Sequence, residues 1–130
     1  MAFMMEFDAK NDILRVTLEG LLTGAILLDG YAAMTRYMAS HPSCRSIVDT
    51  SAVSKFEVSS NAVRQMAGAP PVSPTASMRV FVAPQDSVYG MARMFQILTE
   101  KTRPNFHTAR TIDEAYRLLG VESPTFVPVT

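Results

Sequence analysis

Residues 78–98 read MRVFVAPQDSVYGMARMFQIL, and this stretch decides the fold class. It opens on a short apolar run, Met78–Ala83, which is followed by a proline. A short apolar run bounded in this way predicts a buried strand. After Asp86 the apolar side chains recur every three or four residues, which is the spacing of an amphipathic helix. A buried strand that leads into a helix is the unit from which parallel sheets are built. The inner face of this helix is predicted to carry Val88, Met91, Ala92, Phe95 and Leu98.

Upstream of this unit the sequence predicts a hairpin, a helix, a strand and a short helix. The hairpin alternates polar and apolar residues around an Asn-Asp turn. The next segment places apolar residues at helical spacing until a proline stops it, and a serine is expected to cap the short helix. These segments are the hairpin 4–20, the helix from Thr23 to His41, the strand Arg45–Asp49, the connection Thr50–Glu57 and the helix that opens at Ser59 or Ser60.

Downstream, Arg103–Thr108 is predicted to supply a further strand, and Thr111 with Glu114 forms a capping box that opens a last helix ending at Gly120. The expected order is therefore β-β-α-β-α-β-α-β-α. This order predicts an α/β fold with a mainly parallel sheet, an antiparallel N-terminal hairpin and helices packed on the sheet. We expect a single domain over 1–120 and a C-terminal tail over 121–130.

Composition limits the function classes. The 130 residues are 48% hydrophobic and 18% charged, and 12 Lys+Arg balance 12 Asp+Glu. That balance gives no general attraction to nucleic acid, and no uninterrupted apolar run is long enough for stable membrane insertion. The N-terminus lacks a secretory pattern, so we expect a cytoplasmic protein. Cys44 is the only cysteine, which excludes an intrachain disulfide and a four-cysteine zinc site.

Residues 47–61, IVDTSAVSKFEVSSN, resemble the STAS domains, the family of anti-sigma-factor antagonists and of the cytoplasmic domains of sulfate transporters. Asp49 to Val53 matches the D-x-S-x-V turn of that family. In the antagonists the following helix opens with Asp-Ser-Ser-Gly, and phosphorylation of one serine switches partner binding. The resemblance implies Ser59 and Ser60 as candidate phosphoacceptors, although this stretch is one residue out of register and lacks the glycine.

A second resemblance covers Val88–Phe95, which is similar to a segment of small bacterial STAS-like proteins of unknown function. Those proteins are sometimes grouped with lipid-binding domains of related strand order. The resemblance therefore implies a binding role and names no chemistry.

The carboxyl ends of parallel strands meet at one edge of a sheet, beside helix N-termini that favour anions. We expect the ligand or partner surface at this edge. The alternative is purely structural, with Asp49 closing a turn and Asp86 capping the helix. The candidate residues are Asp49, Thr50, Ser51, Gln85, Asp86, Ser87, Tyr89 and Arg93.

Nothing in the sequence indicates a catalytic, metal or cofactor site. His41 and His107 are the only histidines, and no nucleophile elbow, metalloprotease motif or phosphate loop is present. Gly90, inside a predicted helix, suggests close approach by a neighbouring backbone or a ligand.

Three functions stay open. The first is a non-catalytic regulatory module that recognises a protein partner or a small apolar or anionic ligand through the edge loops and the helix near Ser59. The second is a carrier of a lipid or other apolar molecule, held between the sheet and helix 88–98 and covered by the uncharged loop 67–77. The third is a small enzyme. A homodimer formed through the hairpin edge or a Met-rich face is also expected.

Overall fold

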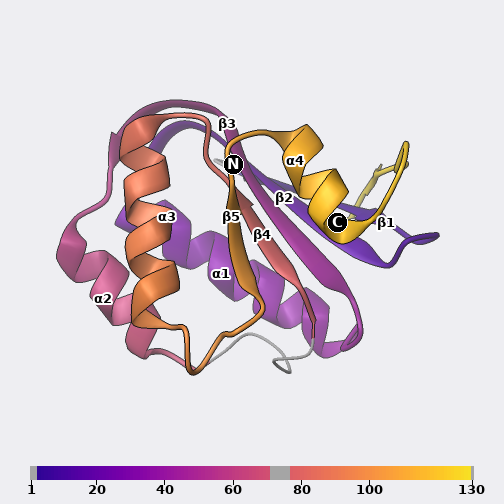
Figure 1. Cartoon of the computed structure of the whole chain (residues 1–130), viewed down its shortest axis with the longest axis horizontal. Coiled ribbons are helices and arrows are strands. Elements are labelled where there is room, and N and C mark those ends of the chain that lie inside the picture. Colours follow the sequence, from indigo (N-terminus) through magenta and orange to yellow (C-terminus); the bar gives the residue numbers. More distant parts are fainter. Residues whose placement is uncertain (1–2, 71–76, 130) are drawn as a thin grey trace.

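The computed structural model describes residues 3–70 and 77–129. Within them the chain forms a mixed sheet with the strand order β5-β4-β3-β2-β1-β6 and four helices (Figure 1). The strands are β1 (Phe3–Asp8), β2 (Ile13–Thr23), β3 (Arg45–Glu57), β4 (Arg79–Val82), β5 (Phe106–Ala109) and β6 (Val127–Pro128). The helices are α1 (Gly24–Ala39), α2 (Ser60–Gly68), α3 (Asp86–Leu98) and α4 (Ile112–Leu119).

The predicted fold class is confirmed. Strands β2 to β5 run parallel to one another, and β1 pairs antiparallel with β2. The Asp8 carboxylate closes the hairpin turn, because its Oδ1 accepts the Asn11 N–H at 3.1 Å and its Oδ2 accepts the Asn11 side-chain amide at 2.8 Å. Asp12 takes a left-handed conformation with φ 57°, which Asp and Asn tolerate better than most residues.

The predicted connection Thr50–Glu57 is wrong, because these residues continue β3. They pair with the second half of β2, and the ladder has two register shifts, between Thr17 and Glu19 and between Gly20 and Leu21. Each irregularity breaks the two-residue alternation of buried and exposed side chains. The buried positions in this half of β3 are Thr50 and Val53, three residues apart, which explains why the sequence lacks a strand pattern there.

The predicted tail contributes an edge strand. β6 pairs antiparallel with β1, and the Thr125 N–H donates to Asp8 Oδ2 at 3.1 Å. Phe126 lies over the guanidinium of Arg15, 4.0 Å from ring centroid to carbon. Arg15 in turn pairs with Glu6 at 2.8 Å, so the end of the chain covers an ion pair on the sheet.

The helices are divided between the two faces of the sheet. One core contains Val16, Leu18 and Phe81 of the sheet, packed with residues of α1, α2 and α3. The other contains Ile47 and Val80 with residues of α4. Figure 1 shows α1 behind the strands and α4 in front of them. Helices α1, α2 and α3 therefore cover one face of the sheet, and α4 covers the other.

The helix ends test the capping predictions. Ser59 caps α2, and Thr111 caps α4 by accepting the Glu114 N–H at 3.1 Å. Gly120 ends α4 in a left-handed conformation with φ 69°. The predicted cap of α3 is wrong, because Gln85 occupies the N-cap position and its side chain donates to the Val53 carbonyl at 2.5 Å instead of capping.

Replacing Ser59 with alanine is expected to lower the free energy of unfolding by about 1 kcal/mol, because the Ala62 N–H would lose the acceptor it contacts at 3.1 Å. Urea denaturation measures the change. Ser60→Ala is the matched control, since Ser60 is exposed in the first turn, and it is expected to change stability by less than about 0.5 kcal/mol. Equal effects of the two substitutions would contradict the capping assignment.

Two expectations for α3 are also corrected. Leu98 is 50% exposed, and the position that faces inward at this end is Thr99, whose hydroxyl donates to the Phe95 carbonyl at 2.7 Å. Gly90 is exposed, and a Cβ built on it would meet no atom within 4 Å. No backbone approaches Gly90 closely in the described part of the chain, so the predicted contact with a neighbouring backbone is wrong, and the alternative of a ligand stays a prediction.

Candidate ligand-binding pocket

The predicted residues on β3 hold the sheet edge together. Asp49 lies opposite Val82, where β4 ends and β3 continues alone beside β2. Asp49 Oδ1 accepts the Ser51 N–H at 2.9 Å and the Ser51 hydroxyl at 2.6 Å. The buried Thr50 hydroxyl donates to the Val82 carbonyl at 2.6 Å. These contacts tie the edge together locally.

The predicted residues on α3 form two separate polar groups. Asp86, whose side chain is 95% exposed, pairs with Arg110 at 2.6 Å, and the Arg110 guanidinium lies 4.5 Å above the Tyr89 ring. Arg93 lies elsewhere on the helix and donates to Gln96 at 2.9 Å. Ser87 is exposed. Arg110 was missed by the sequence analysis, although it directly follows the end of a parallel strand as the other candidates do.

Ser59 and Ser60 are both exposed at the start of α2. The Ser59 hydroxyl oxygen accepts the Ala62 N–H, so its hydroxyl is engaged as a helix cap. A pocket elsewhere in the described part of the chain is lined by none of these two serines and eight edge candidates.

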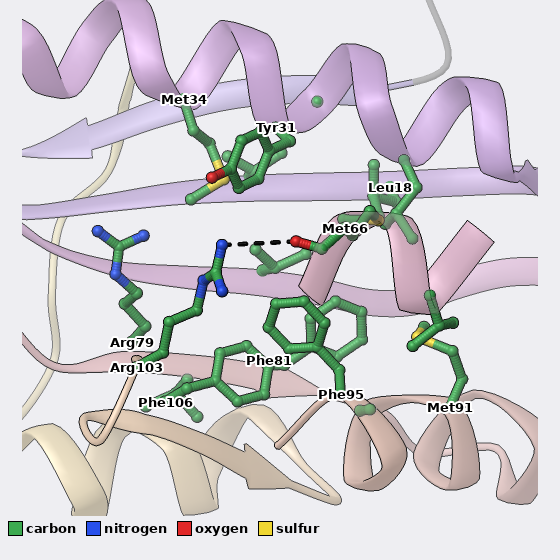
Figure 2. Close-up of a pocket in the computed structure, with 17 residues that line it drawn as sticks. Leu18, Tyr31, Met34, Met66, Arg79, Phe81, Met91, Phe95, Arg103 and Phe106 are labelled. Atoms are coloured by element: carbon green, nitrogen blue, oxygen red, sulfur yellow. Dashed lines mark hydrogen bonds between the residues drawn. The ribbon is translucent and has the colours of Figure 1, made fainter. Parts of the chain in front are cut away.

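That pocket lies between the sheet and helices α1, α2 and α3 (Figure 2). Its volume is about 80 Å³, whereas a single water molecule needs only about 10–15 Å³. The space therefore admits a small organic molecule. The side chains that line most of it are apolar, among them Leu18, Met34, Met66, Phe81, Met91 and Phe95.

The apolar lining follows from strand alternation and helical spacing. Val16 and Leu18 of β2 point to the same face because they are two residues apart, and the buried stripe of α1 faces them. Three methionines come from three different helices. Methionine side chains adapt their shape to what they contact, so this wall can accommodate a flexible ligand.

One end of the pocket is basic. Arg79 is the first residue of β4, and Arg103 lies in the turn that precedes β5. Figure 2 shows both guanidinium groups at the same end, near the Tyr31 ring of α1. The Tyr31 hydroxyl donates to the Pro70 carbonyl. This end corresponds to the amino ends of the parallel strands, opposite to the edge that the sequence analysis favoured.

The Arg103 side chain is buried, with 8% of the residue exposed, and several contacts hold its guanidinium in place. Its guanidinium donates to the carbonyls of Ala67 and Ala69 at 3.2 and 2.7 Å and to that of Met66 at 3.5 Å. Its carbon lies 5.2 Å from the Phe95 ring centroid. These acceptors lie in the last turn of α2 and at its C-cap, where no further helical N–H groups follow to donate to them. The Met66 carbonyl also accepts the Ala69 N–H at 3.2 Å. Arg103 therefore fixes the end of α2 against the pocket.

The two arginines interact electrostatically. Burial lowers the pKa of the Arg79 guanidinium and is the largest influence on it. The nearby positive charge of Arg103 lowers this pKa further, and Tyr31 opposes the change. Arginine nevertheless stays protonated in proteins, so both positive charges persist at neutral pH.

The predicted pocket beside helix 88–98 is therefore present in a different form. Met91, Ala92 and Phe95 of α3 line it, but α1 and α2 contribute as well. Of the loop proposed as its cover, residues 71–76 lie outside the described residues. Within the described chain no group of three or more His, Cys, Asp or Glu is placed to hold a metal ion.

The surroundings of the two histidines and of Cys44 bear on the alternative of a small enzyme. The His41 ring stacks on Tyr37 with centroids 4.3 Å apart and an interplanar angle of 5°. Burial raises the pKa of the Cys44 thiol to about 11, so this thiol keeps its proton at neutral pH and is a weak nucleophile. His107 lies on β5 opposite Val80, which belongs to the core under α4 on the other face of the sheet.

Comparisons with known proteins identify no relative: no protein-family model matches the chain, and no curated protein is significantly similar to it. In residues 3–70 and 77–129, no helix combines the length and apolar character needed to cross a bilayer. The function therefore has to be inferred from the pocket and its chemistry.

Proposed function

We propose that this chain is a non-catalytic, cytoplasmic binding module that carries a small apolar molecule in the pocket between the sheet and helices α1, α2 and α3. The observation that supports the proposal is the pocket itself, lined over most of its surface by apolar side chains from three helices and the sheet. Protein interiors are close-packed, and few of their voids exceed a water molecule. A space of about 80 Å³ that is partly open to solvent and has mainly apolar walls is suited to a small apolar ligand.

The length of the ligand's alkyl chain sets the expected affinity. Transferring one CH2 group from water to an apolar site contributes about 0.8 kcal/mol, so an eight-carbon chain with about seven CH2 groups gains about 5–6 kcal/mol. Such a net free energy corresponds to a dissociation constant on the order of 100 µM. Longer chains gain more until the pocket is full.

The test is calorimetric titration of the purified protein with 1-octanol. Saturable binding of one molecule per chain is expected, with a dissociation constant on the order of 100 µM. The control ligand is 1-butanol, which has four fewer CH2 groups and should bind about 200-fold more weakly. Absence of both binding heat and thermal stabilisation with 1-octanol would contradict the proposal.

Partner recognition at the carboxyl edge of the sheet is the second candidate. The observation that favours it is the surface group in which exposed Asp86 contacts the half-buried Arg110, which lies over the Tyr89 ring, together with the exposed serines at the start of α2. Phosphorylation of Ser59 or Ser60 would add negative charge at the N-terminus of α2. Mass spectrometry after incubation with cell lysate and ATP tests this, and unmodified serines would count against it. Homodimerisation stays a prediction.

A further inference from the structure

We infer that the ligand is a neutral aromatic molecule with a single ring, which packs against the phenylalanine and methionine side chains of the pocket and takes no hydrogen bond from it. The inference rests on the proposed function and adds the chemical class of the ligand. It is carried by the aromatic rings that gather on one wall of the pocket and by the partners that its polar side chains already have within the protein (Figure 2).

Three phenylalanine rings form this aromatic wall. Phe81 lies on β4, Phe95 on α3 and Phe106 at the start of β5, and all three line the pocket. The Phe106 ring centroid lies 4.9 Å from that of Phe95 in an edge-on arrangement and 6.3 Å from that of Phe81. In Figure 2 these rings approach the pocket from the sheet and α3, whereas Tyr31 and Met34 reach it from α1. The wall is therefore one cluster of rings assembled from three separate elements.

An aromatic wall distinguishes between ligands of similar size. The face of an aromatic ring carries partial negative charge and its edge partial positive charge, so a further ring packs favourably against tilted neighbours in an offset or edge-on arrangement. A saturated ring lacks this charge distribution and gains only from the apolar area that it buries. The pocket therefore favours an aromatic ligand over a saturated one with the same number of carbon atoms.

The methionine side chains add to this preference. Met34, Met66 and Met91 line the pocket from α1, α2 and α3. A thioether sulfur interacts favourably with an aromatic ring, often at the ring edge, and the unbranched side chain adjusts to the position of that ring. A ligand ring in this pocket can therefore contact aromatic rings and polarisable sulfur atoms together.

The polar side chains of the pocket already have partners in the protein. Among the described lining residues these are Tyr31, Arg79 and Arg103. The Tyr31 hydroxyl donates to the Pro70 carbonyl, and the Arg103 guanidinium donates to carbonyls at the end of α2. Arg79 also has an interaction partner within the protein. A polar ligand group buried here would lose its hydrogen bonds to water without an equivalent replacement, which costs free energy. The chemistry of the pocket therefore favours a neutral ligand without strong hydrogen-bonding groups.

The volume of the pocket sets the size of the ligand. It is roughly five to eight times the space that one water molecule needs. Such a space has room for the seven carbon atoms of toluene, which is the probe we choose.

The experiment compares three ligands with seven heavy atoms each: toluene, phenol and methylcyclohexane, titrated calorimetrically into the purified protein. Methylcyclohexane has a larger apolar surface than toluene, so a pocket that selected for buried area alone would bind it at least as tightly. We expect toluene to bind about threefold more tightly than methylcyclohexane. Phenol, which has a hydroxyl where toluene has a methyl group, should bind about tenfold more weakly than toluene.

A pair of variants tests the aromatic wall itself. Phe106→Leu removes one ring and keeps an apolar side chain, so it should weaken toluene binding about fivefold and change methylcyclohexane binding by less than about twofold. Phe126→Leu is the matched control, because Phe126 is also partly buried but packs against the core on the other face of the sheet. It should leave all three affinities unchanged. If Phe106→Leu does not fold, the order of the three affinities in the wild-type protein decides.

The outcomes separate the two proposals. Methylcyclohexane or phenol binding as tightly as toluene, or equal weakening of toluene and methylcyclohexane in a folded Phe106→Leu, would overturn the aromatic inference and leave the pocket function standing. The same holds if 1-octanol binds and none of the three rings does. No binding of any of the four molecules would overturn both.

Discussion

Replacing Gly30 with leucine is expected to weaken 1-octanol binding at least 30-fold while the fold persists. Gly30 is buried in α1 and lines the pocket. A Cβ built there would lie 3.8 Å from the Leu18 Cδ2 atom, which is ordinary van der Waals contact. The remaining carbons of leucine would then occupy space that the ligand needs. The loss corresponds to about 2 kcal/mol of binding free energy.

The matched control is Gly90→Leu, the same chemical change at an exposed position of α3. Both substitutions replace glycine inside a helix and should gain up to about 1 kcal/mol of helix propensity. Only the change at Gly30 should affect binding. If the Gly30 variant keeps its cooperative thermal transition and binds 1-octanol like the wild type, the ligand does not occupy this pocket.

Replacing Arg103 with methionine is expected to lower the free energy of unfolding by about 2–4 kcal/mol. The guanidinium donates to three carbonyls at the end of α2, and its loss would leave those of Ala67 and Ala69 without this donor in a partly buried setting, while the Met66 carbonyl keeps the Ala69 N–H. Hydrogen bonds from charged groups contribute about 1.5–3 kcal/mol each when buried, although neighbouring bonds are not additive. Contact with the Phe95 ring would also be lost.

Urea denaturation measures this change, with Arg117→Met as the control. Arg117 is exposed, so its replacement should alter stability by less than about 0.5 kcal/mol. A loss from the Arg103 variant no larger than that of the control would show that Arg103 does not anchor the end of α2.

The order of elements was predictable because each element carries its own local pattern. The strand at 79–82 and the helix caps at Ser59 and Thr111 depend on residues close in sequence. The second half of β3 was missed because bulges in its pairing with β2 disturb the alternation that marks a strand. β6 was missed because its partner β1 lies at the other end of the chain.

The candidate site was harder to predict. The sequence analysis placed polar residues at the carboxyl edge, as the general rule for parallel sheets suggests. The pocket instead depends on how α1, α2 and α3 pack together, and no local pattern encodes that packing. Arg79 heads an apolar strand and Arg103 precedes another, so each looked like an ordinary flanking charge. The available signal was the presence of methionines on three of the helices, Met34, Met66 and Met91.

The most direct test of the pocket uses its methionines. The chain has 9 methionines, and Met34, Met66 and Met91 line the pocket, whereas Met4 is exposed on β1 and Met94 lies on α3 outside the lining. In NMR spectra of protein carrying 13C-labelled methionine methyl groups, titration with 1-octanol should shift the signals of Met34, Met66 and Met91 and leave those of Met4 and Met94 in place. Shifts confined to the methionines outside the pocket, or no shifts at saturating 1-octanol, would contradict a ligand in this pocket.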